Sequence, residues 1–118
     1  MSNSGYKSEG KVVDHVLTGT VTVGDIVPMG DVVGKALSSG VSGETISVQV
    51  AGRFEVAKTT GTAWNQGDKL DWDSSASEFH KGLTPAAGDV TGCAFAAADA
   101  AIGDATAEVI FANPGTAN

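Results

Sequence analysis

A glycine followed by an acidic residue recurs along this chain, and this pair limits the possible fold more than any other feature. The pair occurs at Gly24-Asp25, Gly30-Asp31, Gly67-Asp68, Gly88-Asp89 and Gly103-Asp104, with Gly43-Glu44 as a variant. Most copies stand just before a run of residues typical of a β-strand. Glycine adopts positive φ without strain, and the carboxylate that follows can accept hydrogen bonds from nearby backbone N–H groups. The pattern predicts a small all-β domain that turns repeatedly.

The runs between these turns are short and rich in β-branched residues. The clearest alternation covers residues 45–56, where Ile46, Val48, Val50, Phe54 and Val56 share one face. We expect a half-buried strand there, bent at Ala51-Gly52. Further strands are expected at 11–17, 32–37 (broken by Gly34), 69–72, 92–97 and 106–112, with 78–81 pairing with 69–72 as a hairpin. Residues 58–66 have room for one helical turn, so the fold class is a small β-barrel or sandwich with at most one short helix.

The length of 118 residues fits one domain. We expect a flexible N-terminal arm over residues 1–10, a single β-rich domain over 11–112, and a polar, frayed C-terminal tail over 113–118. The chain has 42% hydrophobic residues, but many are alanines and only 6% of residues are aromatic, so the core is thin. A shared subunit interface stabilises such a domain, and we therefore expect an oligomer.

The charge of the chain argues against two classes of partner. The formal net charge is −7 and Arg53 is the single arginine, so the clustered cations that replace phosphate counterions are missing. We expect no direct nucleic-acid partner and no anionic membrane partner. Cys93 is the only cysteine, and the first residues contain no apolar signal segment, which together indicate synthesis in a reducing cytoplasm.

Residue types that carry catalysis or bind metals are few and scattered. His15, His80 and Cys93 supply the elements of a Cys-His-Asp set, but no local motif supports one, and a small hydrolase stays a third hypothesis. Asp71 and Asp73 share a strand face near Asp68 and offer oxygen ligands for Ca²⁺ or Mg²⁺, yet a solvated acidic face explains them more simply. We therefore predict a protein with no catalytic site, no cofactor and no metal site.

The two tryptophans are the candidates for an interface. Trp64 lies in a polar segment, where it either covers an open end of the barrel or contacts a partner, since tryptophan is enriched at interface hot spots. Trp72 alternates with charged residues in Lys-Leu-Asp-Trp-Asp, and we favour the core for it.

One stretch of the chain carries a family resemblance through the order of its short motifs. Residues 52–73 read Gly-x-Phe-Glu-Val-x-Lys, Gly-Thr-Ala, Gln-Gly-Asp-Lys and Asp-Trp-Asp. Residues 21–36, the pair Gly43-Glu44 before Ile-Ser-Val-Gln-Val, and the alanine-rich ending before the last strand follow in the same layout. Over about residues 10–112 the chain resembles the capsid cement or head decoration proteins of tailed bacteriophages and prophages, some of which were once labelled recombinase-like.

The resemblance implies a β-rich structural protein of the virion, usually a trimer. Such proteins bind the major capsid protein on the outside of an expanded head, at threefold or quasi-threefold positions, and stiffen the shell against packaged DNA. An arm of this kind can add a strand to an exposed sheet edge of the capsid, with Tyr6, Val12 and Val13 as its anchors. The alternative is a β-sandwich adhesion or glycan-binding module displayed on a virion or cell surface, with Trp64 as a sugar platform.

Overall fold

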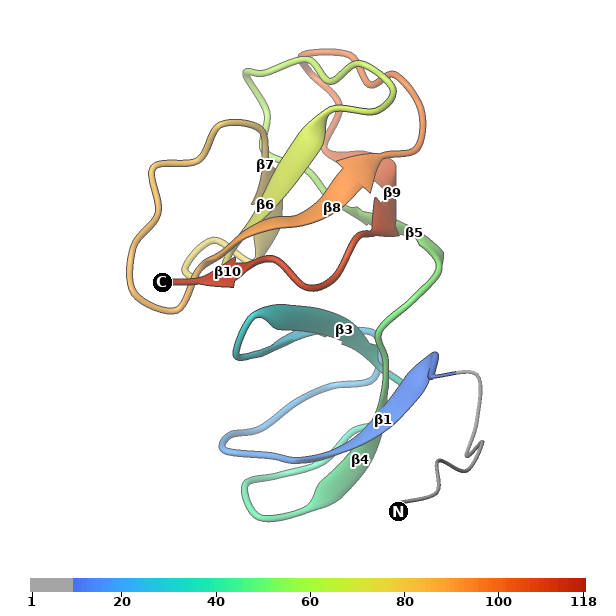
Figure 1. Ribbon diagram of the computed structural model, residues 1–118, viewed down its shortest axis with the longest axis vertical. Helices are drawn as coiled ribbons and strands as arrows, with labels where there is room; N and C mark the ends of the chain where they lie inside the picture. Colours follow the sequence, from blue (N-terminus) through green and yellow to red (C-terminus); the bar gives the residue numbers. More distant parts are fainter. Residues whose placement is uncertain (1–9) are drawn as a thin grey trace, which may run out of the picture.

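The computed structural model describes residues 10–118 and consists of strands and turns (Figure 1). The strands form two sheets, of four and of six strands, and no helix occurs within residues 10–118. In Figure 1 the first sheet lies below the second, and the chain crosses between them once, from β4 to β5. The expected all-β class is confirmed.

The first sheet contains antiparallel strands in the order β1-β4-β3-β2. These strands are β1 (Val12–Val16), β2 (Ile26–Met29), β3 (Val32–Ala36) and β4 (Thr45–Gln49). One face carries a small cluster of buried residues, namely Leu17, Val27, Ala36, Ile46 and Val48. On the opposite face, Val33 and Ile26 pack against the core of the second sheet. This sheet curls but does not close, because β1 and β2 are both edge strands.

The second sheet follows the order β5-β9-β8-β6-β7, and β10 pairs with β8. Its strands are β5 (Arg53–Ala57), β6 (Lys69–Asp73), β7 (Glu78–His80), β8 (Val90–Ala96), β9 (Thr106–Phe111) and β10 (Thr116–Ala117). A parallel bridge joins Lys58 to Phe79, and the Thr59 N–H donates to the Phe79 carbonyl at 3.0 Å. The chain just after β5 therefore meets β7, and this single bridge joins the two ends of a sheet that curls into a small barrel.

The main core fills this barrel. Its large members are Trp64, Leu70, Trp72, Phe79, Val109 and Phe111. The rings of Phe54 and Phe111 lie 4.7 Å apart between centroids, and the ring of Phe79 lies 5.1 Å from Trp72 and 6.4 Å from Phe111. The chain has only seven aromatic residues, and most of them lie in this core. The buried cluster of the first sheet is therefore made of aliphatic side chains alone.

The two sheets repeat one plan. The order β1-β4-β3-β2 corresponds to β5-β9-β8-β6, with β7 as an addition. The registers agree as well: Val12 pairs with Gln49 as Arg53 pairs with Ile110, and Ala36 pairs with Val48 as Ala96 pairs with Val109. We call residues 12–50 the first repeat and residues 53–111 the second repeat.

Hydrogen bonds outside the strands repeat in the same positions. Val21 and Gly40 exchange two backbone hydrogen bonds, as do Trp64 and Ala100. The Leu17 N–H donates to Glu44 as the Lys58 N–H donates to Ala105. The Val50 N–H donates to Lys11 as the Phe111 N–H donates to Gly52. These matched contacts define equivalent positions in the two repeats without reference to side-chain identity.

The glycine-acid turns carry most of this repetition. In five of these turns the acidic side chain accepts a hydrogen bond from the backbone N–H of the residue three positions earlier. The backbone N–H of the acidic residue donates in turn to the carbonyl of that earlier residue. The acidic residues are Asp25, Glu44, Asp68, Asp89 and Asp104. The glycine has φ near +90° in four of the five, at Gly24, Gly43, Gly67 and Gly88. The expected turn chemistry is therefore confirmed for these four, whereas Gly103 does not adopt positive φ.

The long alternation at residues 45–56 forms two strands rather than one bent strand. β4 ends at Gln49 in the first sheet, and β5 starts at Arg53 in the second. Gly52, with φ of +134°, lies at the crossing between them. Apolar and polar residues keep alternating while the chain passes from one sheet to the other. For this reason the pattern predicted a single strand. Gly34 does not break β3, since it lies within the strand and faces Val48 closely.

The expectation that residues 113–118 fray is wrong. Thr116 and Ala117 form β10, and the Ala117 N–H donates to the Asp31 carboxylate at 2.7 Å. The Asn113 side chain accepts from the Val33 N–H and donates to the Val33 and Val50 carbonyls. Polar composition suggested a loose end, but these polar groups satisfy backbone groups of the first repeat and join the two repeats.

Candidate functional site

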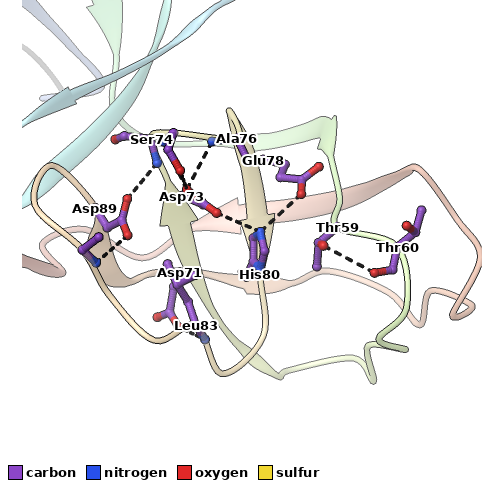
Figure 2. A network of polar contacts seen from close by, with 12 residues as sticks. Thr59, Thr60, Asp71, Asp73, Ser74, Ala76, Glu78, His80, Leu83 and Asp89 are labelled. Carbon is purple, nitrogen blue, oxygen red and sulfur yellow. Dashed lines mark hydrogen bonds and ion pairs between the residues drawn. The ribbon is translucent and has the colours of Figure 1, made fainter.

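A network of polar contacts lies on the β6–β7 hairpin and on the loop that leads from β7 to β8 (Figure 2). The Asp89 carboxylate accepts from the N–H groups of Ser74 and Ala86, at 2.9 and 2.8 Å. The Asp71 carboxylate accepts from the N–H groups of Leu83 and Gly92, at 3.1 and 2.7 Å. Both carboxylates are buried and accept hydrogen bonds from backbone N–H groups. They therefore order the long connection from β6 to β8.

Asp73, Glu78 and His80 form a second group on the β6–β7 hairpin, also drawn in Figure 2. The His80 Nε2 atom lies 3.2 Å from Asp73 Oδ2 and 3.3 Å from Glu78 Oε1. The Ser75 hydroxyl, which donates to Asp73, is the main reason that the pKa of Asp73 lies below its ordinary value. This carboxylate also accepts N–H groups of the hairpin turn, so the group orders the turn of the hairpin.

The residue types expected for catalysis are not brought together. His15 lies in β1 of the first repeat, whereas His80 and Cys93 lie in β7 and β8 of the second. Burial raises the pKa of the Cys93 thiol to about 12, so a thiolate is not accessible near neutral pH. Within residues 10–118, no cluster of three or more His, Cys, Asp and Glu side chains is arranged to hold a metal ion.

Both tryptophans lie in the core. Trp64 is 1% exposed, and the Lys58 Nζ atom lies 5.4 Å from the centre of its ring. Lys58 is itself buried and donates to the carbonyls of Thr59 and Thr62. Trp72 is also buried, as favoured from the sequence. Neither ring offers a surface to a partner or a sugar, so the glycan-binding alternative loses the residue on which it depended.

Exposed apolar side chains gather in the first repeat. The described residues contain seven exposed large hydrophobic side chains, and six of them precede residue 42: Val12, Val13, Val16, Val23, Leu37 and Val41. The seventh, Ile102, lies in a turn of the second repeat. An uneven distribution of this kind marks a surface used for association more strongly than single exposed residues do.

An apolar depression opens on the first repeat where it meets the C-terminal segment. It is lined by Val13, Met29, Val32, Val50, Asn113 and Pro114, and we call it the first-repeat hollow. Three of its residues have aromatic equivalents in the barrel core: Val13 corresponds to Phe54, Met29 to Trp72 and Val50 to Phe111. The hollow therefore stands where the second repeat has its aromatic core.

A second uncommon feature is the edge of β1. Leu17 donates to Glu44, so the odd-numbered residues of β1 exchange backbone hydrogen bonds with β4. The alternation of an antiparallel ladder then directs the N–H and C=O groups of Val12, Asp14 and Val16 away from β4. The equivalent edge residues of β5 are Arg53, Glu55 and Ala57, and Arg53 forms an ion pair with Glu108. Charged residues protect an edge from strand pairing, and the β1 edge has one charge between two exposed valines.

The residues predicted for an arm fall on both sides of the described boundary. Tyr6 lies outside the described residues. Val12 and Val13 belong to β1, where they pair with Gln49 and Val48. Sequence reasoning did not find Met29, Val50 or Asn113. The equivalence of the two repeats reveals Met29 and Val50, whose counterparts Trp72 and Phe111 are aromatic, whereas Asn113 is found only through its contacts with the first repeat.

A family model described as phage cement protein matches residues 7–110, which is most of the chain. The chain therefore belongs to the phage cement protein family. No curated protein and no solved structure matches it. Membership gives the protein a structural role in the virion capsid and association with that capsid, and it points to a structural rather than a catalytic protein. The described residues contain no helix able to span a bilayer.

Proposed function

We propose that this member of the phage cement protein family binds the outer surface of an expanded capsid as a homotrimer. It contacts the major capsid protein at threefold or quasi-threefold positions and stabilises the shell against the pressure of packaged DNA. The observation that carries this proposal is the family match over residues 7–110. The protein is made in the host cytoplasm and performs no catalysis.

We further propose that the first repeat faces the shell. The first repeat (residues 12–50) holds one basic and four acidic residues, whereas the second repeat (residues 53–111) holds four basic and nine acidic residues, so the first has the lower density of carboxylates. The apolar side chains are exposed mainly on the less acidic repeat. Burying apolar area favours association, and carboxylates oppose burial unless they are paired, so the first repeat makes the better contact surface. The acidic barrel then points to solvent and keeps the assembled particle soluble.

The arm belongs to the same proposal. Residues 1–10 come shortly before β1 in the sequence, and Tyr6, Val12 and Val13 are the proposed anchors of the arm on the shell. Three copies around a threefold axis make each weak contact act three times, which raises the overall avidity. Deleting residues 2–10 is expected to weaken binding to heads while leaving thermal unfolding of the isolated protein unchanged. Unchanged binding would remove the arm from the proposal.

The proposal is tested on expanded heads that lack this protein. The protein is added at increasing concentration, the heads are pelleted, and their disruption temperature is measured. We expect saturable binding and a higher disruption temperature, with the saturation ratio giving the number of copies per capsid subunit. Binding without stabilisation would contradict the cement role, and absence of binding to the matching heads would contradict the whole proposal.

A further inference from the structure

We infer that an extended segment of the major capsid protein pairs with the outer edge of β1, which no strand within residues 10–118 covers, and inserts an apolar side chain into the first-repeat hollow. This inference rests on the proposed function and adds to it a defined surface and a defined kind of ligand. It follows from comparing the two repeats, because the second repeat contains within itself the strand that the first repeat lacks.

In the second repeat, β7 supplies this strand. It pairs with the outer edge of β6, where Asp71 faces His80 and Trp72 faces Phe79. The Phe79 side chain is fully buried between the rings of Trp72 and Phe111. The bridge from Phe79 to Lys58 then closes the barrel. A strand with one large apolar side chain is therefore what completes this four-stranded plan.

The first repeat has no segment in that place. Only Gly30 and Asp31 connect β2 to β3, whereas residues 74–89, which include β7, connect β6 to β8. The positions equivalent to Trp72 and Phe111 are Met29 and Val50, and both line the open hollow. A further depression lies between the end of β1 and β2, and it is lined by His15 and residues 17–21 and 25–28. Among residues 10–118, two depressions therefore lie in the gap between the two edge strands.

Of the two edges beside this gap, only β1 can accept a strand along its whole length. The Asp25 carbonyl accepts the Ala36 N–H, so the backbone groups of Val27 and Met29 also point toward β3. The backbone nitrogen of Pro28, between them, points outward. Proline has no N–H to donate, and it protects an edge from pairing. Its equivalent in the second repeat is Asp71, which pairs with β7. The β1 edge carries no proline, and Asp14 stands at its centre.

The charge of this edge indicates the occupant. A symmetric pairing of β1 with β1 of a second copy, centred on Asp14, would set two Asp14 carboxylates directly opposite each other, which is unfavourable. A capsid segment with a lysine or arginine opposite Asp14 would instead form an opposite-charge pair between Val12 and Val16. Because side chains alternate, its residue opposite Val13 lies on the other face, toward the hollow. The ligand is therefore an extended segment with an apolar side chain next to a basic one.

The first test changes the edge alone. Asp14→Pro removes one outward N–H from β1 and reproduces the role of Pro28 on β2. We expect it to weaken binding to expanded heads about tenfold or more, since it breaks a central hydrogen bond and crowds the incoming strand. The matched control is Glu55→Pro, at the equivalent position of β5, which should leave binding unchanged. Equal binding by both variants and the unaltered protein would overturn the inference.

The second test changes the hollow and does not depend on a proline. Val13→Phe places the residue of the second repeat, Phe54, at its equivalent position, so the hollow becomes filled from within. We expect weaker binding with no loss of thermal stability, and Ile102→Phe as a control should bind normally. Stable protein that still binds heads with its original affinity would contradict the inference.

Hydrogen exchange provides a readout on the unaltered protein. On binding to heads, the outward amides of Val12, Asp14 and Val16 should become protected, and those of the equivalent residues Arg53, Glu55 and Ala57 should not. Protection of neither segment, or of the second alone, would overturn the inference. The unaltered protein separates the two levels of the proposal: if it fails to bind heads, the proposed function fails, whereas binding without protection of β1 contradicts only the inference.

Discussion

The two repeats share a strand order, registers and turn hydrogen bonds, yet only the second is closed on itself. The second repeat contains β7, both tryptophans and the four phenylalanines of the chain, and its strands form a barrel. The first repeat contains small aliphatic residues, two edge strands and most of the exposed apolar side chains. The second repeat thus holds most of the core, and the first repeat holds most of the exposed apolar side chains. Under the proposed function, a short insertion and a few side chains separate a stable scaffold from a binding face.

The largest effect is expected from removing the side chain that closes the second repeat. Phe79→Ala leaves a cavity beside Trp72 and Phe111 and should lower the free energy of unfolding by about 3–5 kcal/mol. Denaturation by urea measures this change. The control is Val13→Ala in the first repeat, where the side chain is 39% exposed, and we expect a loss of about 1 kcal/mol or less. Similar losses of stability for the two variants would mean that the two repeats are equally well packed, and the second repeat would then not be the more stable one.

Much of the fold follows from the sequence, because turn chemistry is local. The glycine-acid pairs identify the turns, and the alternation of Lys69-Leu70-Asp71-Trp72 predicts β6 and its hairpin with β7. The repetition of the fold is harder to find, because few equivalent positions hold the same residue. The exceptions include Gly24-Asp25 with Gly67-Asp68, Ala36 with Ala96 and Val48 with Val109. Equivalence lies in backbone pairing, and the pairing partners are far apart in the chain.

The candidate site could be predicted less well than the fold. Trp64 was an interface candidate because its neighbours are polar, yet the loop that carries it folds inward over the barrel and Lys58 covers its ring. The first-repeat hollow depends on Pro114 and Asn113, which come from the segment expected to fray. The residues that line the hollow come from separate segments of the chain. The alternation of residues within one segment therefore cannot predict it, and the tertiary structure is needed.

A smaller effect is expected at the joint between the repeats. Asn113→Ala removes three hydrogen bonds to the backbone of Val33 and Val50 and should cost about 1–3 kcal/mol. Since these bonds connect the C-terminal segment to the first repeat, this repeat should lose protection first. Hydrogen exchange of residues 32–36 and 90–96 compares the two repeats directly. Equal loss of protection in both would show that they unfold as one unit, with Asn113 contributing to overall stability alone.

The smallest effect concerns two equivalent turns in acid. Asp25 and Asp68 accept the same turn N–H, but Asp68 also lies 2.9 Å from the Lys81 ammonium group. The N–H of Asn65, followed by Lys81, lowers the pKa of Asp68 below its ordinary value of 3.8. A carboxylate with a lowered folded-state pKa contributes stability above its unfolded-state pKa, and this contribution is lost as the pH falls through the folded-state value. Asp68→Asn should therefore lower the melting temperature at pH 6, and the gap to the unaltered protein should shrink as the pH falls below about 4, near the unfolded-state pKa of aspartate. If the difference in melting temperature stayed constant down to pH 2, the Asp68 side chain would act through its shape and not through its charge. The ion pair with Lys81 would then not be a stabilising feature that sets the second repeat apart from the first.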